Sequence, residues 1–204
     1  MDEDAVAFVK GLKHMPYVLL SALIVVLDQW FKGYILRLMT LRGPTSVLPG
    51  VLRLSLVYNY GASWGILSGK TALLLVVTVL VCLAILCAIL LDKPAAVLGR
   101  LSLAFILGGA VGNALDRYLL GYVIDMFETE FVSFPVFNVA DCFITVGAAL
   151  LCVWVLLDEK KSRLQRQEAS RRRWEKSREA ARKDADLAER TRREFQGDDD
   201  VSDR

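Results

Sequence analysis

The sequence predicts an all-α membrane protein: a bundle of four transmembrane helices with a small extracytoplasmic β-element and a short interfacial helix. Of its 204 residues, 54% are apolar, and the mean hydropathy is +0.40, which is more apolar than an ordinary soluble domain. The charges are also segregated, because 28 of the 48 Asp, Glu, Lys and Arg residues fall in the last 47 positions. We therefore assign residues 1–157 to a four-span membrane domain and residues 158–204 to a charged cytoplasmic tail, partly helical or disordered.

Four apolar segments account for the predicted spans. Residues 71–91 carry no charge, and 21 helical residues would extend roughly 31 Å, the thickness of a bilayer core. The other spans are predicted at 16–36, at 98–115, which is rich in small residues, and at 138–157. Small residues allow membrane helices to approach closely, so the third span is suited to close packing against its neighbours.

The distribution of basic residues predicts that both termini face the cytoplasm. Lys10 and Lys13 precede the first span, Lys93 and Arg100 lie between the second and third, and a dense basic cluster follows the fourth. Positive charges mark cytoplasmic loops. Four basic residues between the first two spans argue the other way but are outnumbered: Arg37, Arg42, Arg53 and Lys70.

Two short elements are expected in the first outer loop. Residues 51–58 (VLRLSLVY) alternate in character with a period of two, which predicts a strand. Residues 61–67 (GASWGIL) are expected to form the interfacial helix, anchored by Trp64.

Four aspartates near the outer ends of the spans are the main functional signal: Asp28, Asp116, Asp125 and Asp141. A carboxylate costs about 2.5–3.5 kcal/mol at the centre of a membrane helix, so such residues are functional candidates by default. Asn138, three residues before Asp141, is expected to cap the start of the fourth span. Taken singly, Asp141 is then a capping-box acid and Asp125 a loop acid. Taken together, with Asn113 and Asn138 each three residues before an aspartate, they indicate a site.

Two neighbouring carboxylates can hydrolyse an amide without metal or histidine. One holds a proton and polarises the carbonyl, while the other activates a water. The single histidine, His14, excludes most zinc and Ser-His-Asp chemistry. Neither a metal nor a cofactor is predicted, and the four cysteines lie in apolar runs rather than in a disulfide framework.

Five ordered segments within residues 15–157 resemble bacterial lipoprotein signal peptidase (signal peptidase II), an integral-membrane aspartic endopeptidase. They are 28–32 (DQWFK), 59–64 (NYGASW), 108–117 (GGAVGNALDR), 121–127 (GYVIDMF) and 137–141 (FNVAD). Trp64 and Met126 depart from the family's pattern and would change the walls near the expected site.

The resemblance implies a catalytic dyad of Asp125 and Asp141. Supporting or substrate-binding places are implied for a further set: Asn113, Arg117, Asn138, Asp28, Lys32, Asn59, Gly61 and Asp116. The implied substrate is a diacylglyceryl-modified prolipoprotein, cut on the N-terminal side of the lipidated cysteine in a globomycin-sensitive reaction. The implied location is the bacterial plasma or inner membrane, with the site facing outward. We expect a monomer that contacts membrane lipid and binds no nucleic acid.

Two other functions remain open at this point. Buried acids would also suit a small multi-span transporter or channel with a proton relay, although the acids gather at one face and 71–91 has no ionisable residue. A membrane scaffold with a recruiting basic tail is the third reading, but it leaves the paired Asn and Asp residues unexplained.

Overall fold

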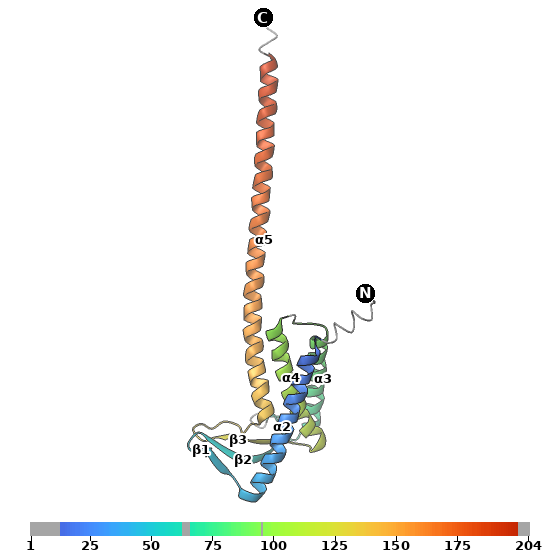
Figure 1. The fold of residues 1–204 in the computed structure, drawn as a ribbon, viewed down its shortest axis with the longest axis vertical. Coiled ribbons are helices and arrows are strands. Elements are labelled where there is room, and N and C mark those ends of the chain that lie inside the picture. Colours follow the sequence, from blue (N-terminus) through green and yellow to red (C-terminus); the bar gives the residue numbers. More distant parts are fainter. Residues whose placement is uncertain (1–12, 63–65, 95, 200–204) are drawn as a thin grey trace, which may run out of the picture. The chain divides into compact units, whose positions relative to one another are not determined.

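The computed structural model describes residues 13–62, 66–94 and 96–199. The chain divides into two compact units, Met1–Val155 and Leu156–Arg204. Four helices dominate the described residues: α2 (Met15–Arg42), α3 (Thr71–Leu90), α4 (Val97–Leu119) and α5 (Val139–Asp199) (Figure 1). Each contains a segment long and apolar enough to cross a membrane, which confirms the four predicted spans.

Two of the helices extend well beyond the apolar runs that predicted them. α2 continues to Arg42 rather than ending near residue 36, and α5 continues to Asp199 rather than ending near residue 157. The extension of α5 is rich in good helix formers, and i,i+4 ion pairs such as Glu159–Arg163 line it. Apolar runs therefore located the spans but not the helix ends.

Helix α4 is the central helix of the first unit. Its small residues bring neighbours close: a Cβ on Gly108 would lie 2.7 Å from Ile24 Cβ of α2, and one on Gly109 would lie 2.4 Å from the Ala140 carbonyl oxygen of α5. This close packing matches the expectation for the third span. α3, by contrast, buries only Ile89 among its described residues, so its apolar surface is free to face lipid.

A three-stranded antiparallel sheet lies beside the helices, in the order β1-β2-β3 (Figure 1). Its strands are β1 (Thr45–Leu48), β2 (Leu52–Asn59) and β3 (Val123–Thr129). β2 confirms the strand expected at 51–58, shifted by one residue. β1 and β3 were not predicted, because β1 is short and exposed throughout, and β3 begins with four consecutive buried residues rather than an alternating pattern.

The sheet explains why α2 is longer than a span. Ile35 and Met39, in the last turns of α2, pack against Ile124 and Met126 of β3 in one buried cluster. Met126 is fully buried there and lines neither of the cavities described below, so the expectation that it alters the wall of the site is wrong.

The predicted interfacial helix at 61–67 cannot be compared in full, because residues 63–65, including Trp64, lie outside the described residues. On either side, Gly61 and Ala62 form a bend and residues 66–69 form a turn.

Candidate active site

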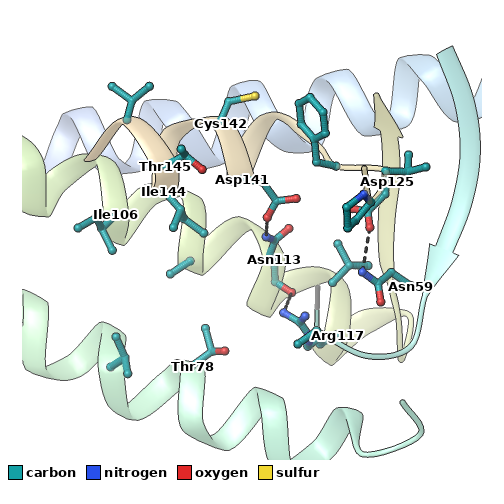
Figure 2. A pocket seen from close by; sticks show the side chains of 18 of the residues that line it. Asn59, Thr78, Ile106, Asn113, Arg117, Asp125, Asp141, Cys142, Ile144 and Thr145 are labelled. Carbon is teal, nitrogen blue, oxygen red and sulfur yellow. Dashed lines mark hydrogen bonds between the residues drawn. The ribbon is translucent and has the colours of Figure 1, made fainter. Parts of the chain in front are cut away.

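Five polar side chains converge at one end of the helices, and four of them, Asn59, Asn113, Asp125 and Asp141, are labelled in Figure 2. They come from the end of β2, the C-terminal half of α4, the middle of β3 and the start of α5: Asn59, Asn113, Asp125, Asn138 and Asp141. The antiparallel course of α4 and α5 brings the end of one and the beginning of the other to the same level. The pairing of β2 with β3, in which Val57 faces Asp125 and Asn59 faces Val123, brings the strand residues to this level as well.

Both carboxylate oxygens of Asp125 accept hydrogen bonds from side-chain amides. Asn138 Nδ2 donates to Oδ1 at 2.7 Å, and Asn59 Nδ2 donates to Oδ2 at 3.0 Å. The side chain is 2% exposed. Burial raises the pKa of Asp125 to about 6, with the neighbouring Asp141 carboxylate adding to the rise, while the amide donors and the Lys32 charge oppose it. Asp125 can therefore hold a proton at a pH where an exposed aspartate cannot.

Asp141 sits in the first turn of α5 and is held from two sides. Asn113 Nδ2 donates to its Oδ1 at 2.8 Å, and the backbone N–H of Asn138 donates to its Oδ2 at 3.1 Å. In return, Asn138 Oδ1 accepts the backbone N–H of Asp141 at 2.9 Å. This reciprocal arrangement is a capping box, so Asn138 is the helix cap that its spacing predicted.

Asn138 connects the two aspartates directly. Its side-chain amide donates to Asp125 and, at 3.0 Å, to Asn113 Oδ1, while its backbone binds Asp141. Asn138 is fully buried, so the hydrogen bonds of its side-chain amide to Asp125 and Asn113 are made away from water. The two carboxylates that the sequence singled out are thus brought to one place by a single residue.

A buried ion cluster lies behind this group. Lys32 Nζ contacts Asp28 Oδ2 at 2.8 Å and Asp116 Oδ2 at 2.8 Å, and all three side chains are 3% exposed or less. Gly112 is required beside it, because a Cβ there would lie 2.6 Å from Asp28 Oδ2. The sequence grouped the four aspartates at the outer face, and the structure divides them into two layers: Asp28 and Asp116 with Lys32, and Asp125 and Asp141 in front.

Arg117 and Gly61 complete the set of predicted residues. Arg117 donates to the Gly61 carbonyl oxygen at 3.1 Å, and Asn59 Oδ1 accepts the Gly61 backbone N–H at 2.9 Å. Arg117 Nε is buried and has no hydrogen-bond partner among the described residues. The guanidinium lies in the same cavity wall as the two aspartates.

A cavity of about 750 Å³ opens onto these polar groups (Figure 2). Asp125, Asp141 and Arg117 line one part of it, and the remainder is largely apolar. Its apolar wall comes from α3, α4 and α5: Val77, Val81, Ile106, Ala110, Ile144 and Val146. A second cavity of about 470 Å³ also reaches Asp125, from the side of β2 and residues 133–136. Asp125 therefore borders both cavities, although its side chain is almost fully buried.

Two features of the site were not anticipated from the sequence. Gln29 donates to Asp116 Oδ1 at 2.8 Å and to the Gly112 carbonyl oxygen at 3.2 Å, which links α2 to α4. The presence of a glutamine within the apolar span 16–36 could have indicated this polar contact between the helices. Residues 134–137 line the large cavity and approach β3 through backbone hydrogen bonds between Phe137 and Phe127, for which the sequence offered no pattern.

Comparison with known proteins adds independent information. Residues 20–157 match a family model described as signal peptidase (SPase) II. Among curated proteins, a lipoprotein signal peptidase of Enterococcus faecalis is 40% identical over 147 residues, covering 72% of this chain and 91% of the relative. A lipoprotein signal peptidase of Geobacillus kaustophilus is 41% identical over 141 residues, covering 68% and 92%.

Two solved structures share the fold. One, described as a bacterial membrane enzyme structure by the in meso method at 2.3 Å resolution, aligns with a TM-score of 0.67 at 30% identity and covers 72% of this chain and 90% of its own. A second, with the same description at 1.9 Å, aligns with a TM-score of 0.63 at 31% identity, covering 69% and 92%.

Proposed function

Because the chain belongs to the signal peptidase II family, the bacterial membrane peptidases that remove signal peptides from prolipoproteins, we propose that Asp125 and Asp141 are its catalytic dyad. Family membership assigns the chain to peptidases rather than to transporters or scaffolds. The main support for this dyad is that both carboxylates accept hydrogen bonds from Asn138 and line the wall of one cavity.

The proposed chemistry follows from a pair of carboxyl groups that shares one proton. The ionised carboxylate takes a proton from water as the water oxygen attacks the scissile carbonyl carbon. The protonated partner donates to the carbonyl oxygen, and the C–N bond then breaks as the leaving nitrogen takes up a proton. The raised pKa of Asp125 supports a role for it in holding the shared proton.

The supporting residues have separable roles in this proposal. Asn59, Asn113 and Asn138 orient the carboxylates, since each donates to one or both of them. Arg117 lines the cavity and would bring its positive charge to a substrate carbonyl, with the Gly61 carbonyl oxygen accepting from its Nη2.

The proposed substrate is a prolipoprotein that carries diacylglyceryl on the cysteine after the scissile bond. The large cavity combines an apolar wall of membrane-helix residues with the two aspartates at one end, which suits a substrate that is part lipid and part peptide. Binding of the acyl chains, far from the reacting bond, would orient that bond against the dyad.

We further propose a monomer with both termini in the cytoplasm, so that the dyad faces the outer surface. The basic residues before α2, between α3 and α4 and after the apolar part of α5 support this orientation. Trypsin added to sealed right-side-out vesicles should leave the Lys- and Arg-rich tail intact, while inverted vesicles should lose it. Removal of the tail from the outside would reverse the assignment.

The dyad is tested by Asp125→Asn and Asp141→Asn with a diacylglyceryl-modified precursor in detergent. Each variant should lose cleavage by several orders of magnitude while still inserting and folding, because an amide can neither take nor give the proton. Asp158→Asn on the exposed part of α5 is the matched control and should cleave normally. Globomycin should inhibit the wild-type reaction. Normal cleavage by both dyad variants would remove the assignment.

A further inference from the structure

Lys32 is a membrane-buried ammonium whose three donors are all used. Besides Asp28 and Asp116, its Nζ donates to Asn113 Oδ1 at 3.1 Å, and the side chain is 2% exposed. It lines neither cavity, so it does not contact a substrate bound there. A charge buried this deeply is costly to retain, and stability alone does not require it.

The two carboxylates paired with Lys32 hold the backbone next to each proposed catalytic aspartate. Asp28 Oδ1 accepts the N–H of Ala140 at 3.0 Å, and Ala140 directly precedes Asp141. Asp116 Oδ2 accepts the N–H of Ile124 at 3.1 Å, and Ile124 directly precedes Asp125. Lys32 thereby holds the carboxylates of Asp28 and Asp116 in position. These carboxylates in turn hold the backbone at the start of α5 and in β3.

The third donor of Lys32 fixes an amide that touches the dyad. Asn113 Oδ1 accepts from Lys32 and from Asn138, so its Nδ2 is the end that must face Asp141. Without the ammonium, the Asn113 amide would lose one of the two donors that hold it in this orientation.

We propose that Lys32 is a positioning residue that sets the spacing and orientation of Asp125 and Asp141 through Asp28, Asp116 and Asn113. The inference rests on the proposed dyad and adds a residue that acts on it without touching the substrate. Its consequence is a defect in the chemical step rather than in binding, because the cavity walls do not include Lys32.

The first test is Lys32→Met, with cleavage rates measured against concentration of lipidated precursor. We expect kcat to fall by up to about 100-fold, since a 1 Å misplacement of catalytic groups costs this much, while KM stays within about twofold. Lys13→Met makes the same chemical change at an ion pair with Asp92, before the start of α2, and should leave both constants unchanged.

The second variant, Lys32→Met with Asp28→Asn, guards against misfolding by an uncompensated charge. The double variant removes one positive and one negative charge, so the cluster has the same net charge as in the wild type, now carried by Asp116 alone. An asparagine at position 28 can still accept the Ala140 N–H. The Asn113 contact is still lost, so kcat should remain well below wild type.

The pH profile gives a readout that a purely structural role would not move. Asp125 is faced by Asp141 from α5, Arg117 from α4 and Lys32 from α2, and the Lys32 charge favours its ionised form. Loss of the Lys32 charge should therefore move the alkaline limb of kcat to higher pH in Lys32→Met, and by less in the double variant, which also loses the opposite charge of Asp28.

Three outcomes would overturn the proposal: folded variants with wild-type kcat, a change confined to KM, or failure of both variants to fold, which would assign Lys32 to stability alone. These outcomes are distinguishable from failure of the dyad itself. If Asp125→Asn and Asp141→Asn are inactive while the Lys32 variants cleave normally, the dyad stands and only this inference falls.

Discussion

Gly109→Ala tests whether the distance between α4 and α5 controls catalysis. The new Cβ would lie 2.4 Å from the Ala140 carbonyl oxygen and 2.8 Å from Ile144 Cγ1. Ordinary van der Waals contact begins near 3.4 Å, so the two helices must separate by about 1 Å at this level. The obstacle is backbone, which cannot rotate away as a flexible side chain can.

The separation should reach the dyad because Gly109 and Asn113 lie one helical turn apart on α4. The hydrogen bond from Asn113 Nδ2 to Asp141 Oδ1 is now 2.8 Å, and a 1 Å displacement would stretch it beyond normal hydrogen-bond length. We expect kcat for a diacylglyceryl-modified precursor to fall about 100-fold. Overpacking should also cost about 1–3 kcal/mol of stability.

The measurement is the initial rate of precursor cleavage in detergent, with thermal unfolding recorded on the same preparations. Gly33→Ala is the matched control, because a Cβ at Gly33 would meet no heavy atom within 4 Å, and it should retain wild-type kcat. A folded Gly109→Ala variant with wild-type kcat would refute the dependence of the dyad on this helix spacing.

Two further predictions address the dyad and the tail. Asn59→Ala removes a donor that favours the ionised form of Asp125, so the pKa of Asp125 should rise above about 6. The dyad would then keep its shared proton to higher pH, and the alkaline limb of the pH–rate profile should move upward; a limb that stays or moves down would contradict this. Deletion of 160–204 should leave cleavage in detergent unchanged, because none of the described residues of that segment lines either cavity. Loss of cleavage in the truncated protein would place the tail in the site.

Local patterns predicted much of the architecture. Apolar runs located all four spans, because crossing a bilayer requires about 20 consecutive apolar residues wherever the neighbouring helices lie. The alternation at 51–58 located β2, and Leu54 and Leu56 of its apolar face pack against the buried cluster, but the one buried residue of the strand, Ser55, lies on the other face. β3 escaped prediction because its first residues are buried on both sides, a condition created by α2 on one face and the site on the other.

The site residues were recognisable by type and by resemblance, but their partners were not. Asn138 was predicted as a cap from its spacing to Asp141, three residues away. Its hydrogen bond to Asp125 joins an element that no local rule connects to it. Lys32 matched a family position with no defined role, and its contacts with Asn113 and Asp116 lie more than 80 residues along the chain.

The sequence by itself determined which segments enter the membrane and which polar residues are too costly there to be incidental, because both follow from the solvation of each residue. Only the tertiary structure decided how those residues divide: Asp125 and Asp141 at the cavity, and Asp28 and Asp116 on Lys32 behind them. The physical reason is that a buried charge must find its partners in space, and α2, α4, β3 and α5 supply them from distant positions in the chain.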